Sequence, residues 1–300
     1  MAKAIPIFNQ ADSQPFERSA NRVLDCAGKV LDLRYPQVMG ILNITPDSFS
    51  DGGQFMSPGS AVQRANEMVR QGAAIIDIGG ESTRPGAPQV SIEEELARVI
   101  PVIEALRNDL TVPISIDTSK PEVMREAVRA GAGMINDVRA LREKGALQTA
   151  VELDVPVCLM HMQGEPRTMQ HSPHYGDVVA EVKSFLKDRI KTCIESGISR
   201  DRLLIDPGFG FGKSLEHNLR LLQGLNEFRD LNIPLLAGFS RKSMIGQILG
   251  VPVQERLYGS IALATLALWQ GANLVRVHDV RATRDAIGII NAIRDFDTVC

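Results

Sequence analysis

From Gln37 onward, short apolar runs alternate with longer segments that carry apolar residues at helical spacing. This alternation is typical of a parallel sheet whose strands are covered by helices. Ser91–Leu110, Val178–Ser196 and Ile261–Trp269 predict three of the helices, and Ser91 with Glu94 has the form of a capping box. Eight apolar runs predict strands, at Val38–Thr45, Ala74–Gly80, Pro113–Thr118, Met134–Val138, Val155–His161, Leu203–Asp206, Pro234–Ser240 and Leu274–His278.

The number of strand-helix units indicates an α/β fold, a closed (β/α)8 TIM barrel. Such barrels typically need about 250 residues, and the units here occupy about 260. An open doubly wound sheet is the alternative, but no G-x-G-x-x-G motif follows the first strand. No linker, solenoid repeat or low-complexity run divides the chain. We therefore expect one barrel domain at residues 37–300, preceded by a short N-terminal extension at residues 1–36.

Composition narrows the classes of partner. The chain is 44% hydrophobic and 23% charged, and its net charge of −3 argues against a nucleic-acid surface, which usually carries a basic excess. The longest strongly apolar run, Ile261–Trp269, is shorter than the roughly 20 residues of a membrane span. Residues 1–36 lack the pattern of a signal peptide, and the four cysteines lack disulfide or metal-ligand spacing. We expect a cytoplasmic protein that binds a small molecule and neither nucleic acid nor membrane.

Polar or reactive side chains stand at the carboxyl end of every predicted strand. In a barrel these ends form the mouth in which active sites lie. A lone Asn or Thr at such a position is often a helix cap or a satisfied buried group. Their occurrence at all eight ends favours a binding site. In chain order they are Asn43; Glu81 to Arg84; Asp117; Asn136 and Asp137; Met160 and His161; Asp206; Ser240 to Lys242; and Arg276 with His278.

The segment Leu204–Lys213 places Asp206 at the end of an apolar strand, followed by three glycines within five residues. On its own this motif could be an ordinary turn with a capping acid. The glycines also permit backbone conformations that bring a loop flat against a planar ligand.

The acids and amides of the mouth match the donors of a flat heterocycle. Asp117, Asn136 and Asp206 offer acceptors and one amide to a ring with adjacent N–H and NH₂ donors, such as a pterin or guanine. Lys242 can donate to the ring, although a basic Ser-Arg-Lys run alone would more often be a solvated helix start. Arg276 can stack on the ring while donating to an anion.

Phosphate binding is predicted at the same mouth. His278 and Asn43 add donors near the loops that follow the last two strands, the usual phosphate site of barrels. His161 stands between two methionines, so we interpret it as a packed core residue, and we give Asp77 a supporting role. Two loops, Thr45–Gly53 and Glu81–Gly86, combine Gly and Pro with charged tips and resemble loops that close on a substrate.

These motifs, in this order, resemble the dihydropteroate synthase family over nearly all of the chain from Gln37 to the C-terminus. Ile44 stands where valine is common, and the extension is longer than in many members. The matching segments are Asn43–Gly53, Gly79–Gly86, Ser115–Thr118, Asn136–Asp137, Asp206–Lys213, Ser240–Lys242 and Arg276–Asp279.

The resemblance implies a homodimeric enzyme of folate synthesis, and a sulfonamide target, that joins p-aminobenzoate to a dihydropterin pyrophosphate and uses Mg²⁺. It implies pterin contacts at Asp117, Asn136, Met160, Asp206, Lys242 and Arg276, and p-aminobenzoate contacts at Phe49, Thr83, Pro85, Phe211 and Ser240. It implies pyrophosphate contacts at Asn43, Arg84, Arg276 and His278, with Asn43 also binding the metal. Asp51, Arg84, Lys242 and Arg276 are the expected catalytic residues.

The expected chemistry needs no enzyme nucleophile, because pyrophosphate leaves readily once cations neutralise it and the pterin-methyl cation is delocalised. Two alternatives remain at this point. One is a methyltetrahydrofolate-binding methyltransferase barrel, which would not need the Thr45–Gly53 loop or the Ser-Arg-Lys run. The other is a non-catalytic pterin-binding subunit, which we would expect to lack the anion donors Asn43, Arg84, Arg276 and His278.

Overall fold

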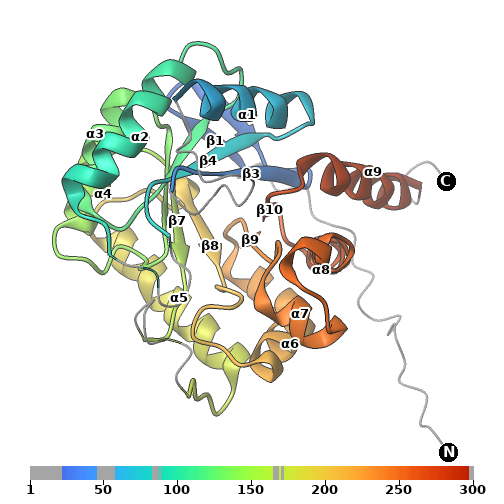
Figure 1. Cartoon of the computed structure of the whole chain (residues 1–300). Coiled ribbons are helices and arrows are strands. Elements are labelled where there is room, and N and C mark those ends of the chain that lie inside the picture. The colour runs from blue at the N-terminus through green and yellow to red at the C-terminus, as the bar shows by residue number, and fades with distance from the viewer. Residues whose placement is uncertain are drawn as a thin grey trace, which may run out of the picture.

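The computed structural model describes residues 22–45, 58–82, 87, 89–164, 169 and 172–296. Eight parallel strands form a ring in the order β8-β7-β6-β5-β4-β3-β10-β9, with helices arranged around it (Figure 1). A parallel bridge between Ile205 and Leu235 joins the two ends of this order and closes the ring. The predicted TIM barrel is confirmed, and the open sheet is wrong. The strands are β3 (Gln37–Asn43), β4 (Ile75–Gly79), β5 (Ile114–Asp117), β6 (Met134–Asp137), β7 (Val157–Met160), β8 (Leu203–Asp206), β9 (Leu236–Ala237) and β10 (Leu274–Val277).

The helices lie between the predicted strands. At the start of α2 (Ile92–Leu106) the Ser91 hydroxyl accepts a hydrogen bond from the Glu94 amide at 3.2 Å, which is one half of the predicted capping box; the Glu94 carboxylate pairs instead with Arg98. In the described ranges no helix is both long enough and apolar enough to cross a membrane. The α-helices are α1 (Pro58–Arg70), α2 (Ile92–Leu106), α3 (Pro121–Ala130), α4 (Ala146–Leu153), α5 (Val178–Glu195), α6 (Leu215–Gln223), α7 (Ser243–Leu249), α8 (Leu257–Trp269) and α9 (Val280–Phe296).

Successive strand residues face opposite sides of the barrel wall, as the pleat requires. On β4, Ile76 and Ile78 pack in the outer core with the helices, whereas Ile75 belongs to a separate cluster inside the ring. The same alternation places Asp77 on the inner side with Ile75. The interior is therefore filled in layers, and on β4 the inward side chains change from apolar Ile75 to acidic Asp77.

A two-stranded hairpin covers the amino-terminal end of the barrel. It consists of β1 (Val23–Cys26) and β2 (Lys29–Asp32), which pair antiparallel across a turn with positive φ at Ala27 and Gly28. Its buried side chains, Leu24, Cys26, Leu31 and Leu33, pack against the apolar inner layer formed by Met39, Ile75, Met134, Cys158, Leu204, Leu236 and Leu274. We call this apolar cluster the floor.

The hairpin lies within the predicted extension, and the sequence pattern did not indicate it. Its strands are four residues long; β1 buries two alternate side chains and β2 buries only Leu31, so the apolar signal is weak. The fit to the barrel is close, because a Cβ added at Gly133 would lie 2.2 Å from the carbonyl oxygen of Cys26. The first barrel strand begins at Gln37, where we set the domain boundary.

Candidate active site at the barrel mouth

Strand register aligns Asn43, Asp117 and Asn136 along one side of the ring, and Met160 with Asp206 along another. Asn43 lies opposite Gly79, and Gly79 lies opposite Asp117 on the next strand. Asp117 in turn lies opposite Asn136. Met160 of β7 lies opposite Asp206 of β8. Asn43 and Asp206, which are more than 150 positions apart in the sequence, are therefore both the last residues of barrel strands at the carboxyl end of the ring.

Arg276 is the centre of a buried polar cluster. Its Nε donates to Asp77 Oδ2 at 2.6 Å, and its Nη2 donates to Asp117 Oδ2 at 2.7 Å. Asn136 donates from Nδ2 to the same Asp77 oxygen at 3.1 Å. Asp77 is fully buried, and its Oδ1 has no hydrogen-bond partner in the described part of the chain. Asp77 thus orients both Arg276 and Asn136, which is the supporting role that we predicted.

The low-dielectric surroundings alter the protonation of this cluster. Burial raises the pKa of Asp117 to about 7, and the neighbouring Arg276 opposes that rise. Burial acts to lower the pKa of Arg276, but Asp77 and Asp117 together raise it above its ordinary value. Arg276 therefore stays cationic, while the charge on Asp117 changes near neutral pH.

Asp206 and Lys242 form the second part of the mouth. Asp206 Oδ1 accepts a hydrogen bond from the Gly208 amide at 2.7 Å, which fixes the carboxylate. Lys242 donates to the carbonyl of Phe209, and its ammonium lies 4.6 Å from the ring centroid of Phe211. Burial lowers the pKa of Lys242 to about 8, and Asp206 opposes the shift. Burial raises the pKa of Asp206, and Lys242 opposes that shift.

The glycines after β8 are needed for close approach of the backbone. Gly208 has φ +70°, and a Cβ there would lie 1.9 Å from the carbonyl oxygen of His161. Gly210 has φ +79°, and a Cβ there would press against Lys242 Cδ at 3.2 Å. The loop thus packs on the end of β7 and makes room for the Lys242 side chain.

Lys213 holds this loop in place, a role that our sequence reasoning missed. Its buried ammonium lies 2.9 Å from the Gly208 carbonyl oxygen, 3.0 Å from that of Phe211 and 2.9 Å from His161 Nδ1. Burial, and then the charge of Lys213, lowers the pKa of His161 to about 2, so this histidine is neutral. His161 is 6% exposed, which agrees with its interpretation as a packed residue. The only sequence signal for Lys213 is its place directly after a glycine-rich run.

The ends of β9 and β10 are joined at the other side of the mouth. Ser240 Oγ lies 2.9 Å from His278 Nδ1 and accepts a hydrogen bond from the His278 amide at 3.1 Å. Arg241 donates from Nε and Nη2 to the two carboxylate oxygens of Asp279, at 3.1 and 2.7 Å. Arg241 adopts φ +57°, an unfavourable value for a residue with a Cβ. The loops that carry Lys242 and His278 are therefore held to each other.

Of the other predicted contact residues, the structure describes Met160 but not those of the two loops. Met160 is 3% exposed and packs in a small apolar cluster with Val138, Met162 and Met169, against which Phe211 also packs. The predicted residues Phe49, Asp51, Thr83, Arg84 and Pro85 lie outside the described residues.

Oxygen donors suited to a hard cation are present at the mouth. A Cβ added at Gly79 would lie 3.7 Å from both Asn43 Oδ1 and Asp117 Oδ2, so these oxygens face the same space. Over the described ranges, no group of three or more His, Cys, Asp or Glu side chains could hold a metal ion. Mg²⁺ commonly takes only one or two protein oxygens and completes its shell with waters and substrate phosphates. The amide oxygen of Asn43 fits that mode of binding.

Comparison with known proteins gives a consistent result. A model of the pterin-binding enzyme family matches residues 39–278. The dihydropteroate synthase of Escherichia coli (strain K12) is 58% identical over 265 residues, which cover 88% of this chain and 94% of the relative. A Yersinia pestis dihydropteroate synthase, solved as a sulfonamide drug complex, superposes with a TM-score of 0.88 at 53% identity, covering 91% of this chain and 99% of that one. A Xanthomonas albilineans dihydropteroate synthase in complex with 7,8-dihydropteroate has a TM-score of 0.83 at 52% identity, covering 91% and 98%.

Proposed function

The chain belongs to the dihydropteroate synthase family of pterin-binding enzymes, and from that premise we propose how its residues divide the work of the reaction. The chain is a transferase of folate biosynthesis that joins dihydropterin pyrophosphate to p-aminobenzoate and releases pyrophosphate. The methyltransferase barrel and the non-catalytic subunit are not favoured, because the relatives that match over most of the chain are synthases.

The pterin is bound by Asp117, Asn136 and Asp206 at the level where their strands end. Asp77 holds the Asn136 amide and Gly208 holds one oxygen of Asp206, so both groups are oriented before the ligand arrives. Preorganised acceptors of this kind lose little freedom on binding. Lys242 donates to the ring, Met160 forms an apolar wall, and Arg276 stacks on the ring face. The observation that carries this proposal is one buried network, in which Asn136 and Arg276 both donate to Asp77 and Arg276 also donates to Asp117.

Arg276 and His278 bind the pyrophosphate, together with Asn43 and Arg84. The permanent charge of Arg276 supports this role, since a leaving pyrophosphate must be neutralised in a dry site. Asn43 would hold Mg²⁺ through its amide oxygen, and the bound ion would neutralise part of the negative charge of the leaving group.

The p-aminobenzoate site is formed by Phe211 and Ser240 with Phe49, Thr83 and Pro85. Phe211 lies against the Lys242 ammonium, and Ser240 is hydrogen-bonded to His278, so both stand next to the pterin and anion residues. In the reaction the carbon-oxygen bond to pyrophosphate breaks, the arylamine nitrogen forms the new bond to that carbon, and a proton leaves the nitrogen. Arg276 and Lys242, with Arg84, stabilise the departing charge, and Asp51 completes the site.

One assay tests this proposal. Purified protein is mixed with dihydropterin pyrophosphate, and pyrophosphate release is followed with and without p-aminobenzoate and Mg²⁺. We expect release only when both are present. Release that is independent of p-aminobenzoate would contradict the condensation, and undiminished turnover in a chelator would contradict the metal.

We propose that the chain forms a homodimer through the faces of α8 and α9. These adjacent helices expose large apolar side chains: Leu266 and Trp269 are 49% and 42% exposed, and Ile289, Ile293 and Phe296 are 65%, 51% and 71% exposed. Their proximity is supported by Arg294, which donates to the Leu268 carbonyl. Apolar patches of this kind are typical of interfaces. Sedimentation should give a dimer for the natural chain and a monomer for Ile293→Glu, and a monomeric natural chain would contradict the proposal.

We also propose a cytoplasmic location and a domain boundary between residues 36 and 37. Three buried cysteines, Cys26, Cys158 and Cys193, are free thiols, as is common in a reducing compartment. The boundary divides the hairpin sheet from the eight-stranded sheet, and the hairpin of the extension packs against the floor of the barrel domain.

A further inference from the structure

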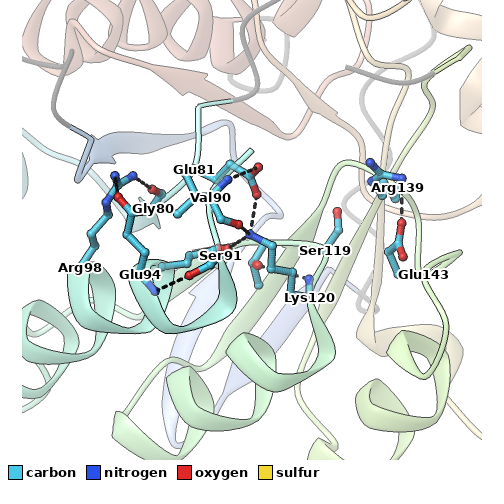
Figure 2. Close-up of polar contacts among 12 residues, drawn as sticks. Gly80, Glu81, Val90, Ser91, Glu94, Arg98, Ser119, Lys120, Arg139 and Glu143 are labelled. Atoms are coloured by element: carbon cyan, nitrogen blue, oxygen red, sulfur yellow. Dashed lines mark hydrogen bonds and ion pairs between the residues drawn. The ribbon is translucent and has the colours of Figure 1, made fainter. Parts of the chain in front are cut away.

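Lys120 follows strand β5 and binds residues after the neighbouring strand β4 and at the start of α2. It directly precedes α3 and lies three residues after Asp117. Its ammonium donates to Glu81 Oε2 at 2.8 Å, to the Val90 carbonyl oxygen at 2.7 Å and to Glu95 Oε2 at 2.6 Å. Figure 2 shows the Lys120 side chain reaching towards Glu81 and Val90. All three ammonium protons are used, so this geometry is strongly specified.

The two ends of the segment between Glu81 and Val90 are also bonded to each other. Glu81 Oε1 accepts a hydrogen bond from the Val90 amide at 3.2 Å, across nine positions of sequence. The Gly80 carbonyl accepts from Arg98 Nη1 of α2 at 2.6 Å, an interaction visible in Figure 2. Both ends of the segment are thereby held to each other, to α2 and, through Lys120, to the strand that ends in Asp117.

Lys120 stays charged although its side chain is largely excluded from water. The Lys120 side chain is 17% exposed and that of Glu95 is 1% exposed. Burial acts to lower the pKa of Lys120, but the hydrogen bonds and charges of Glu81 and Glu95 raise it above its ordinary value. A buried ion pair adds little net stability compared with apolar side chains of similar volume. A role in fixing the local geometry accounts better for its presence.

We propose that Lys120 is a positioning residue for p-aminobenzoate, acting through Glu81 and Val90. This inference rests on the proposed function, because Thr83 and Pro85, to which we assign p-aminobenzoate contacts, lie in sequence between the two anchored residues. Lys120 and Asp117 follow the same strand, so the pterin acceptor and the base of the p-aminobenzoate segment share one support. Removing the anchor loosens one substrate site and leaves the other in place.

The first experiment uses Glu81→Ala, which removes both contacts of this carboxylate while Lys120 keeps Glu95 and the Val90 carbonyl. Lys120→Met alone would leave the buried Glu95 unpaired and can unfold the chain. The second variant is therefore Lys120→Met combined with Glu95→Gln. Glu143→Ala is the matched control, since it removes a carboxylate that pairs with Arg139 after the next strand, as Figure 2 shows.

Two measurements are made on each folded variant. Amide hydrogen exchange at Val90 reports the anchor itself, and steady-state kinetics give KM separately for p-aminobenzoate and for the pterin substrate. We expect faster exchange at Val90 and a KM for p-aminobenzoate raised about tenfold, because small displacements at a reacting site are costly. We expect the KM for the pterin to stay within about twofold, and the Glu143→Ala control to match the natural chain in all three values.

An unchanged KM for p-aminobenzoate in both variants, with faster exchange at Val90, would overturn the proposal. A parallel loss for both substrates would also overturn it, since that is the mark of a general structural role. If the natural chain itself failed to condense the two substrates, the proposed function would be wrong, and that failure is seen before any variant is made.

Discussion

The two ends of the same barrel strands differ completely in character. On β8, Leu204 belongs to the apolar floor, whereas Asp206, two residues later, is a buried acid of the mouth. On β10, Leu274 lies in the floor and Arg276 in the charged network. Two residues of a strand advance about 7 Å, so the interior changes from hydrocarbon to ion pairs within one layer.

This difference separates the source of stability from the source of function. The floor buries apolar side chains from seven barrel strands and from the hairpin. The mouth buries Asp77, Asn136 and Asp206, which cost free energy to remove from water. The floor contributes stability that offsets this cost, and the mouth keeps oriented polar groups that water would otherwise screen.

The largest expected effect comes from removing the cover of the floor. Deleting residues 1–36 removes four buried apolar side chains, Leu24, Cys26, Leu31 and Leu33, and exposes the inner layer beneath them. At roughly 1.5–3 kcal/mol for each large apolar side chain, the loss is comparable with the whole stability of a typical domain. We expect the truncated chain to be insoluble or unfolded by circular dichroism. Deleting residues 1–21 keeps the hairpin and should leave the melting temperature near that of the full chain; equal melting of both truncations would contradict the account.

A substitution in the mouth should weaken pterin binding and leave the folding of the chain intact. Asp206→Asn replaces an acceptor with an amide that mismatches the ring donors, and should weaken pterin binding by about 1–3 kcal/mol, roughly ten- to a hundredfold. Asp117→Asn should act similarly, with an added effect from its lost pairing with Arg276. Calorimetric titration measures both. Asp201→Asn, at an exposed position in the 3-10 turn just before β8, is the control, and unchanged affinity in both mouth variants would remove these residues from the pterin site.

The mouth should also impose a pH dependence that the floor does not. The pterin acceptor Asp117 must be ionised, and its pKa of about 7 means that kcat/KM for the pterin falls as pH drops below that value. Lys242 must be protonated, and its pKa of about 8 means that kcat/KM falls as pH rises above that value. We expect a plot of kcat/KM against pH to be a narrow bell, in which kcat/KM falls by up to about tenfold per pH unit on either side. Asp117→Asn should abolish the acidic limb, and an unaltered acidic limb in that variant would assign it to another group.

The smallest effect is expected at the rim, where Arg241 pairs with Asp279. The Arg241 side chain is 43% exposed and that of Asp279 is 21% exposed, so solvent screens their attraction. A double-mutant cycle of Arg241→Ala and Asp279→Ala should give a coupling of about 0.2–1 kcal/mol in melting experiments. The pair joins the loops of Lys242 and His278. Each single variant should therefore lower kcat measurably while it changes the melting temperature very little. A normal kcat in both would show that the loops are held by other contacts.

The barrel was predictable because its signal is local. Each strand is a short apolar run, and the polar residue that ends it, such as Asp117 or Asp206, is visible in the sequence. The hairpin was missed because its four-residue strands bury only one or two side chains each, against a layer formed by distant strands.

Buried lysines were missed for a related reason. Lys213 and Lys120 look like surface lysines in the sequence, and only the packed fold shows that carbonyl and carboxylate oxygens surround each ammonium. Asp77 was recognised as supporting, because it interrupts an apolar strand, but its partners Arg276 and Asn136 lie on other strands. Sequence pattern thus indicates which residues are unusual, whereas their partners depend on strand order and register.

We assign the pterin site to the charged layer of the mouth, two residues above the apolar floor. A crystal structure of the chain with bound dihydropterin pyrophosphate would test this assignment. We expect the ring within hydrogen-bonding distance of Asp117, Asn136 and Asp206, with Arg276 across its face. A pterin bound elsewhere, for example in the surface cavity between α6 and α7 lined by Ser214, Asn218 and Gln247, would contradict it.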